Sequence, residues 1–176
     1  MESKKNDYTS LKIDIDDKVL TLTLNRPKSL NSLSLQLFLE LKSFFETFSE
    51  KVLKENDVRC VILKGSNGNF SSGLDLKSEI VQSFGGNDDL DTGRKAFWIS
   101  NMIQTLQECV SSIEKCPLPV IAAIEGYCLG GATSLITCCD MRFCTDNSVF
   151  SIKEIEIGLT ADIGVLQRMG RRMLSC

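Results

Sequence analysis

Two acidic residues, Glu154 and Asp162, follow two glycine-marked turns in a chain that contains no histidine. Proton transfer near neutral pH must therefore use carboxylates, cysteines, lysines or tyrosines, because imidazole, the usual group, is absent. The two turns, 70–76 (FSSGLDL) and 126–131 (GYCLGG), each lie beside an apolar run. Glycine lets the backbone approach a ligand there, so main-chain N–H groups can face it. These features predict carboxylate acid–base chemistry beside backbone amides.

The two turns follow apolar runs at 58–63 and 119–124 that read as buried strands. If these strands are neighbours, both turns lie at the same end of a sheet, where two amides can hold one oxygen. Each such donor is worth roughly 3 kcal/mol to an oxyanion in known sites. The alternative is that Gly73, Gly130 and Gly131 only permit tight turns and close helix packing, and spacing alone favours this alternative.

The acids themselves also admit two interpretations. In one continuous helix Glu154 and Asp162 would lie ~12 Å apart along the axis, whereas the glycine between them indicates a bend that could aim both at one extended ligand. Asp162 could instead cap a helix that begins at Ile163. Glu154 could be a solvated acid paired with Lys153 or Arg168. The residues alone leave these alternatives open.

Size and charge limit the class of protein. The 176 residues, 43% of them hydrophobic, are enough for one globular domain, 1–176, that buries ~70% of its unfolded surface. A formal charge of −3 and scattered basic residues disfavour a nucleic-acid partner. No run approaches the ~20 apolar residues that span a bilayer, and the polar start lacks signal-peptide character. We expect an intracellular protein without membrane contact.

The cysteines indicate a reducing compartment rather than a disulfide scaffold. Without a secretory signal, we expect them to be reduced, buried, small hydrophobes. Without histidine or a Cys-x-x-Cys pair, a metal site has little to build on, and we expect none. The eight residues are Cys60, Cys109, Cys116, Cys128, Cys138, Cys139, Cys144 and Cys176.

Apolar periodicity predicts strands that alternate with helices. A helix over about 33–54 is capped by Ser32 or Ser34, and another over about 97–113 ends before Pro117. The polar stretch 77–93 reads as a loop or poorly formed helix, and a short helix follows the second glycine turn. The predicted strands are 20–24, 58–63, 119–124, 140–145 and 148–152, of which the continuously apolar 119–124 is expected to be covered on both faces.

Four motifs in order carry a family resemblance: Asn25-Arg26-Pro27 with Leu30 to Leu33, then 70–76, then 119–126. Over about residues 10–168 the chain resembles the crotonase (enoyl-CoA hydratase/isomerase) superfamily. The later stretch 151–168 is similar to its dienoyl-CoA isomerase branch, which converts 3,5-dienoyl-CoA to 2,4-dienoyl-CoA in fatty-acid β-oxidation. The implied fold is α/β, crotonase/ClpP-like, a spiral of repeated β-β-α units. Successive strand-strand-helix units coiling around one core agree with it.

The resemblance assigns roles to particular residues. It implies that the backbone N–H groups of Leu74 and Gly131 form the oxyanion hole, that Glu154 handles the C2 proton and that Asp162 serves C6. No metal or redox cofactor is implied, and coenzyme A enters as part of the acyl-CoA substrate. The implied substrate- and CoA-binding residues are Lys28, Ser29, Leu30, Ser72, Gly73, Leu74, Asp75, Leu76 and Gly131.

Two departures from the branch matter. A third acid normally present in the helix after the second turn is replaced by Ser134, which argues against hydration and supplies no charge to tune the other acids. The chain also ends at Cys176, where relatives continue into C-terminal helices. We therefore expect those helices to be missing, and exposed apolar surface where they would pack.

The resemblance leaves several alternatives. A non-catalytic acyl-CoA-binding or scaffold subunit is favoured by Ser134 and the short ending, and a 3-enoyl-CoA isomerase would not need Asp162. A homotrimer or hexamer is expected if the C-terminal helices are present in the native protein. The resemblance implies a peroxisomal location, with mitochondrion or cytoplasm as alternatives, because the chain shows no targeting signal.

Overall fold

A five-stranded mixed sheet forms the centre of the computed structural model, which describes residues 8–55, 57–78, 80–81 and 91–172. Its order is β1-β2-β3-β4-β6. The edge strand β1 is antiparallel to β2, and the pairings β2–β3, β3–β4 and β4–β6 are parallel. The strands are β1 (Leu11–Asp16), β2 (Val19–Leu24), β3 (Cys60–Gly65), β4 (Val120–Ile124) and β6 (Met141–Cys144).

A second, two-stranded sheet pairs β5 (Tyr127–Leu129) with β7 (Val149–Ser151) in parallel. The sequence predicted only a turn over 126–131, and this was wrong in detail because Tyr127 to Leu129 extend against β7 before α4 begins. The parallel neighbours β3 and β4 confirm that both glycine turns leave the same end of the main sheet.

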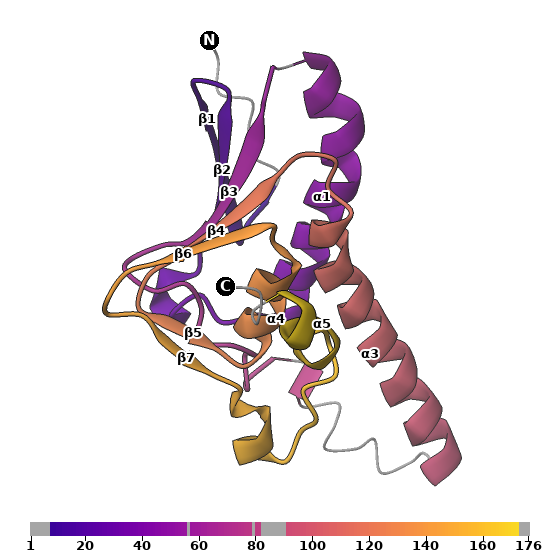
Figure 1. Cartoon of the computed structure of the whole chain (residues 1–176). Coiled ribbons are helices and arrows are strands. Elements are labelled where there is room, and N and C mark those ends of the chain that lie inside the picture. The colour runs from indigo at the N-terminus through magenta and orange to yellow at the C-terminus, as the bar shows by residue number, and fades with distance from the viewer. Residues whose placement is uncertain (1–7, 56, 79, 82–90, 173–176) are drawn as a thin grey trace.

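Two long helices, α1 (Leu35–Glu55) and α3 (Thr92–Glu114), pack against each other, and α1 runs along one face of this sheet (Figure 1). The hydroxyl of Ser34 accepts the N–H of Leu37 and so caps α1. Helix α3 begins earlier than the sequence predicted, because the Asp91 side chain accepts the N–H of Arg94. Part of the predicted loop 77–93 is therefore helical, and its residues 79 and 82–90 lie outside the described part.

The core lies between the sheet and these helices. Leu20, Leu22 and Leu24 of β2 are fully buried on the helix side, as their alternation predicted. From α1, Phe38 and Leu41 are also fully buried. Burial of each such side chain is worth about 1.5–3 kcal/mol, so packing rather than helix propensity holds α1 in place.

The opposite face of the sheet is less covered than the sequence predicted. In β4, Val120, Ala122 and Ile124 are buried, whereas Ile121 and Ala123 are only half-buried. The continuous apolar run had indicated cover on both faces, and this prediction was wrong. Among the described residues no helix packs on that second face (Figure 1).

The chain continues through α4 (Gly131–Cys138), the short 3-10 helix η2 (Lys153–Ile157) and α5 (Val165–Arg172), while η1 (Pro27–Ser29) follows β2. The order of the main strands and helices is the one predicted from the sequence. Large apolar side chains remain exposed on α3, η2 and α5, including Phe97 at 71%, Ile155 at 81% and Leu166 at 60%.

The cysteines were predicted to be buried, and this holds for some of them. None of the seven in the described part forms a disulfide, and Cys109, Cys128, Cys138 and Cys139 are buried. For Cys144 the prediction was wrong, because this residue ends the edge strand β6 and is exposed. The described residues include no cluster of metal-binding side chains, and none of the helices they form is long and apolar enough to cross a bilayer.

Candidate active site

The two glycine turns touch each other. Ser71 bridges Cys128, since its N–H donates to Tyr127 O and its carbonyl accepts the N–H of Leu129. Gly73 comes next, with φ at +88°, and a Cβ built there would lie 2.6 Å from Leu129 O. Only glycine allows both this left-handed conformation and this approach. The sequence could not decide whether these glycines bring two backbones together, and the structure shows that they do.

Leu74 presents a free amide at this meeting point. Leu33 N–H donates to Gly73 O (2.8 Å) and Asp75 N–H donates to Leu33 O (3.0 Å), so the bridge uses the residues that flank Leu74. The N–H of Leu74 consequently points away from Leu33. Among the described residues it has no acceptor. A half-buried amide in this state is available to a ligand oxygen.

Gly131 presents the second amide. It is the first residue of α4, whose initial N–H groups have no intrahelical acceptor. Gly130 before it has φ +51° and ψ −124°, and its N–H donates to Ser151 O at 2.7 Å. In the described chain Gly131 N–H has no acceptor. The two amides predicted as oxyanion donors are thus both unused, beside turns that are in contact.

Glu154 lies against the second turn. A Cβ built on Gly130 would lie 3.5 Å from the carboxylate carbon and both oxygens of Glu154. Although the residue as a whole is half-buried, both oxygens are buried and have no hydrogen-bond partner in the described structure. Burial raises the pKa of Glu154, and the negative charge of Asp162 raises it further. A carboxyl group with a raised pKa binds a proton more strongly than an ordinary glutamate, which suits it to proton exchange with a substrate.

The solvated-acid interpretation of Glu154 is wrong. Lys153 pairs instead with Glu156 at 2.8 Å, and Arg168 pairs with Glu114 at 2.9 Å. The two basic residues considered as partners of Glu154 thus pair with other acids, and no ion pair of Glu154 is found among the described residues.

Asp162 is brought back toward Glu154 by a bend. Gly158 ends η2 in a left-handed conformation (φ +72°), and helix α5 begins only at Val165. The bend predicted from the glycine is confirmed, whereas a helix starting at Ile163 was wrong, because 162–164 form a turn. Among the described residues the Asp162 carboxylate makes no hydrogen bond or ion pair.

Ser134 is the fourth residue of α4. It is fully buried, and its hydroxyl has no hydrogen-bond partner among the described groups. A Cβ built on Gly164 would lie 3.3 Å from Ser134 Cβ, so Ser134 faces the turn that carries Asp162. The replacement of the third acid therefore leaves a small uncharged group beside that turn.

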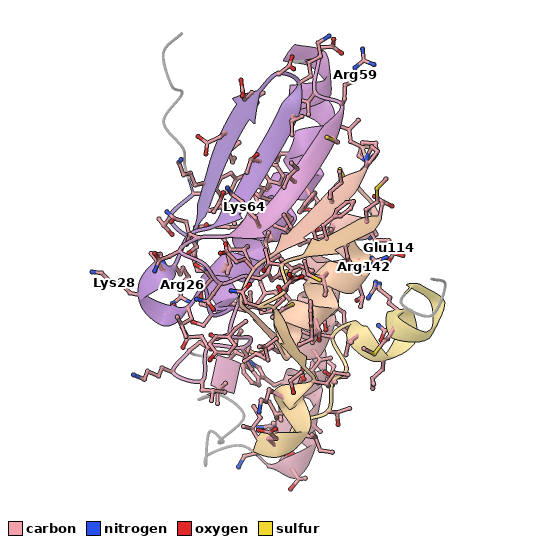
Figure 2. The ribbon with its side chains drawn as sticks, turned by 60° about the vertical axis from the view of Figure 1, so that its left-hand side comes forward. Arg26, Lys28, Arg59, Lys64, Glu114 and Arg142 are labelled. Atoms are coloured by element: carbon pink, nitrogen blue, oxygen red, sulfur yellow. The ribbon has the colours of Figure 1, made fainter. Side chains whose placement is uncertain are left out.

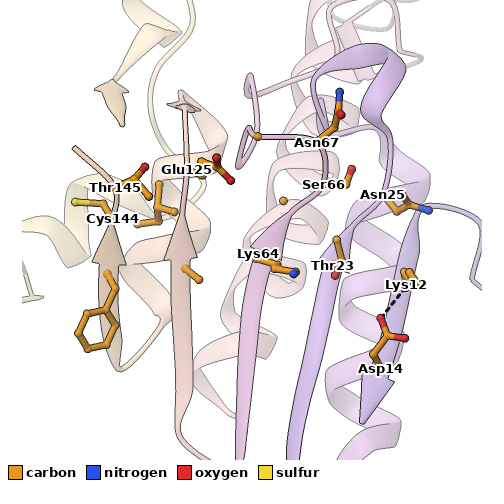
Figure 3. A pocket seen from close by; sticks show the side chains of 15 residues that line it. Lys12, Asp14, Thr23, Asn25, Lys64, Ser66, Asn67, Glu125, Cys144 and Thr145 are labelled. Atoms are coloured by element: carbon orange, nitrogen blue, oxygen red, sulfur yellow. Dashed lines mark ion pairs between the residues drawn. The ribbon is translucent and has the colours of Figure 1, made fainter. Parts of the chain in front are cut away.

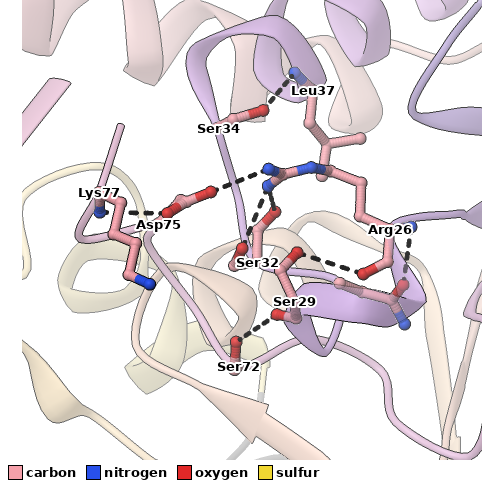
Figure 4. A network of polar contacts seen from close by, with 9 residues as sticks. Arg26, Ser29, Ser32, Ser34, Leu37, Ser72, Asp75 and Lys77 are labelled. Carbon is pink, nitrogen blue, oxygen red and sulfur yellow. Dashed lines mark hydrogen bonds and ion pairs between the residues drawn. The ribbon is translucent and has the colours of Figure 1, made fainter. Parts of the chain in front are cut away.

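The predicted CoA-binding segments are held together by a polar network (Figure 4). Ser72 N–H donates to Leu30 O (3.0 Å) and its hydroxyl donates to Ser29 O (3.3 Å). Arg26 donates through Nη2 to Asp75 at 2.9 Å. Segment 26–30 thereby fixes the first glycine turn and with it the Leu74 amide.

Asp75 is occupied by this network rather than free for a ligand. Burial would raise the pKa of Asp75, but the hydrogen bonds from Arg26 and the Lys77 N–H outweigh it, so the pKa is lowered. Both partners of the ion pair are mostly buried, at 27% and 17% side-chain exposure. The main chain of Asp75 is also used, since its N–H donates to Leu33 O and its carbonyl accepts the N–H of Ser78.

The remaining predicted binding residues lie at the surface. Lys28 projects from η1 into solvent (Figure 2), where its cation could meet a phosphate. Leu30 and Leu76 are 42% and 53% exposed. The structure thus places 28–30 and 72–76 side by side, while Lys28 itself stays clear of the turn.

A separate groove of about 570 Å³ lies at the carboxyl ends of β2, β3, β4 and β6 (Figure 3). Lys64 and Glu125 are among the side chains around it. None of the residues predicted for catalysis or CoA binding lines this groove. The candidate site is therefore the junction of the glycine turns and not this hollow.

Comparison with protein families now places the chain. Residues 14–174 match the family model described as enoyl-CoA hydratase/isomerase. The chain belongs to the enoyl-CoA hydratase/isomerase family. It is 39% identical over 172 residues to the mitochondrial Delta(3,5)-Delta(2,4)-dienoyl-CoA isomerase of Mus musculus, which covers 96% of this chain and 50% of that protein. It is also 39% identical over 165 residues to the peroxisomal enzyme of that name from Arabidopsis thaliana, and this match covers 92% of this chain and 58% of that protein.

Solved structures show the same fold. A protein from Thermobifida fusca YX assigned as an enoyl-CoA hydratase, solved with acetoacetyl-CoA, is 28% identical with a TM-score of 0.73 and covers 91% of this chain and 60% of its own. One from Streptomyces coelicolor A3(2) gives a TM-score of 0.79 at 26% identity, covering 97% and 58%. This family member spans about half the length of the curated relatives it matches.

The sequence did not reveal two residues that stabilise the site by binding its other residues. Arg26 was noted only as part of a motif, yet it fixes Asp75 across 49 residues. Gln107 on α3 was assigned only to a helix, yet its amide donates to Asp162 O at 2.8 Å. No local pattern signals either contact, because each depends on how distant segments pack.

Proposed function

We propose that this family member isomerises 3,5-dienoyl-CoA to 2,4-dienoyl-CoA. The observation that carries the proposal is the Glu154 carboxyl group, buried without a partner against Gly130, next to an unused amide and within the electrostatic influence of Asp162. The likeness to dienoyl-CoA isomerases at 39% identity supports the substrate class.

In the proposed mechanism, the thioester oxygen accepts hydrogen bonds from the N–H groups of Leu74 and Gly131. Glu154 as carboxylate removes a proton from C2, and the C2–H electron pair spreads over the conjugated chain onto that oxygen. Each amide lowers the barrier by roughly 3 kcal/mol. The raised pKa makes Glu154 a stronger base than an ordinary glutamate.

Asp162 completes the reaction at the far end of the diene. It enters this step protonated, so that the two acids together carry one proton and one charge, and it donates that proton to C6 while the double bonds move from C3 and C5 to C2 and C4. Glu154 then holds the proton from C2 and Asp162 is ionised, so exchange with water restores the starting state. Chemistry of this kind uses only carboxylates and amides of the chain.

The direct test follows the absorbance of conjugated product from 3,5-dienoyl-CoA. We expect Glu154→Gln and Asp162→Asn each to lower turnover by at least about 10²-fold. Glu156→Gln and Asp146→Asn are matched controls, because both acids are exposed and lie outside the site. Turnover that is unchanged in the first two variants would refute the assigned roles.

The same variants separate the alternatives. Tight binding of a saturated acyl-CoA by calorimetry without turnover would identify a non-catalytic subunit. Isomerisation of 3-enoyl-CoA that survives Asp162→Asn would identify a monoene isomerase, because that reaction ends at C4 and needs no group at C6. Ser134 gives the first alternative its only structural support, since it leaves the acids without a third charge.

The relatives' names place those proteins in mitochondria or peroxisomes. We propose an organellar location for this chain on that basis, to be checked by fractionation. Association with further copies, through the exposed apolar side chains of α3, η2 and α5, is likewise a proposal that sedimentation can test.

A further inference from the structure

The turn that carries Asp162 packs through the buried Ala161 and through Ile163 but has few main-chain hydrogen bonds of its own. Gly158 has no atom within 4 Å of where a Cβ would stand. The N–H of Leu159 donates to Glu154 O, but among the described residues no main-chain carbonyl accepts an N–H from 160–164. A loop without its own hydrogen bonds holds a side chain only as well as its neighbours allow.

Helix α3 supplies one attachment directly at Asp162. The half-buried side chain of Gln107 donates through Nε2 to the Asp162 carbonyl at 2.8 Å, across 55 residues of sequence. That carbonyl is bonded to the same Cα that bears the acid. Holding it therefore restrains the peptide group next to the Cα from which the carboxylate side chain leaves the backbone.

A second attachment follows one turn later. Arg168 of α5 donates to Glu114 (2.9 Å), to the Ser111 hydroxyl (2.9 Å) and, more weakly, to Gly164 O (3.4 Å). Its side chain is only 13% exposed. An ion pair with additional hydrogen bonds in this setting is geometrically restrained.

The third attachment is apolar. A Cβ built on Gly164 would lie 3.2 Å from Val110 Cγ1, so the turn packs closely on α3. Gln107, Val110, Ser111 and Glu114 recur at helical spacing and form one face of α3. We call these four residues the α3 face; Glu114 is labelled in Figure 2.

We propose that the α3 face, and Gln107 above all, positions Asp162 for proton transfer at the distal carbon. Gln107 touches the backbone of Asp162 and not the reacting atoms, so it is a positioning residue. The inference rests on the proposed function. A displacement of about 1 Å at a catalytic group can cost 10²-fold in rate, and loss of the Gln107 attachment alone, with the others kept, should cost about 10-fold.

The decisive variant is Gln107→Met, which keeps the length of the side chain and removes the donor. Gln104→Met is the matched control, because Gln104 lies one turn earlier on α3 and is exposed. With 3,5-dienoyl-CoA in deuterated water, exchange at C2 reports Glu154 and the two amides. Formation of the conjugated product, labelled at C6, reports Asp162.

We expect Gln107→Met to slow product formation about 10-fold while exchange at C2 and KM change less than about twofold. An equal decrease in the rates of product formation and of exchange at C2, or a decrease in neither rate, would overturn the positioning role. If the unaltered chain gives neither exchange nor product, the proposed function fails instead.

A second measurement, which needs no turnover, tests whether Gln107 holds the turn that carries Asp162. The Leu159 N–H donates to Glu154 O and closes the bend before Asp162, so its hydrogen exchange should become about 10-fold faster in Gln107→Met. Exchange should stay unchanged over 127–138 and in Gln104→Met. Unchanged protection of the Leu159 amide would show that the contact does not hold the turn, whatever the chain catalyses.

Discussion

Replacement of Gly73 by alanine tests the contact between the two glycine turns. A Cβ at this position would stand 2.6 Å from Leu129 O and 3.2 Å from Leu129 C, and the backbone φ is +88°. Both obstacles are main chain, so a side-chain rotation cannot relieve them. Leu74, the next residue, would move with any displacement.

The cost has two parts that a control can separate. Left-handed φ costs an alanine about 1–2 kcal/mol, and overpacking against backbone adds about 1–3 kcal/mol. Gly68→Ala carries only the first part, since Gly68 has φ +72° and its Cβ would meet nothing closer than Glu125 Oε1 at 3.8 Å. Gly73→Ala should therefore be less stable than Gly68→Ala by about 2 kcal/mol.

Thermal or urea unfolding measures this difference. For a chain of this size, about 2 kcal/mol corresponds to a Tm lower by about 4–8 °C. In the turnover assay Gly73→Ala should also lose at least about 10²-fold, as expected when one oxyanion donor is displaced, while Gly68→Ala keeps its rate. Equal stability and equal turnover of the two variants would refute the close approach of the turns.

Three other perturbations follow from the same geometry. Because burial raises the pKa of Glu154, its ionisation destabilises the folded state. Glu154→Gln should therefore raise Tm near neutral pH, and the Tm difference should vanish below pH 4.5, the ordinary pKa of glutamate. A higher Tm of the variant at every pH would contradict this. Asp75→Asn should lower the free energy of unfolding by about 2 kcal/mol, because it removes the ion-pair partner of Arg26. Since the pKa of Asp75 is lowered, this loss of stability should fade below pH 3.8, the ordinary pKa of aspartate. A loss that does not depend on pH in urea titrations would argue against the ion pair. Cys144 should react before Cys128 with a thiol reagent followed by mass spectrometry, because Cys144 is exposed whereas burial raises the pKa of Cys128 to about 12; equal rates would mean that the core opens.

Much of the fold could be predicted because local patterns of apolar residues show which face of each strand or helix is buried. The alternation at Leu20, Leu22 and Leu24 and the helical repeat that includes Phe38 and Leu41 both reported which face is buried. The start of α3 was missed because a single side chain, Asp91, caps it within a polar stretch that reads as loop. Such a cap contributes about 1 kcal/mol, too little to alter a pattern read over many residues.

The site could be predicted in part. The identity of the acids and the glycines was visible, and Gly158 correctly indicated the bend toward Asp162. Neither the contact of Gly73 with Leu129 nor the unpaired state of Glu154 could be read from spacing, because the first depends on how β3 and β4 pair and the second on how β5 and β7 pair. The same holds for Gln107, whose partner lies 55 residues away.

The most direct measurement of the central claim is an amide proton–nitrogen spectrum of the labelled chain with hexanoyl-CoA, a saturated thioester that cannot isomerise. If the thioester oxygen lies between the two glycine turns, the amide protons of Leu74 and Gly131 should both move downfield on binding. Free CoA, which has no thioester carbonyl, should leave them in place. Binding of hexanoyl-CoA with both signals unchanged would contradict the account.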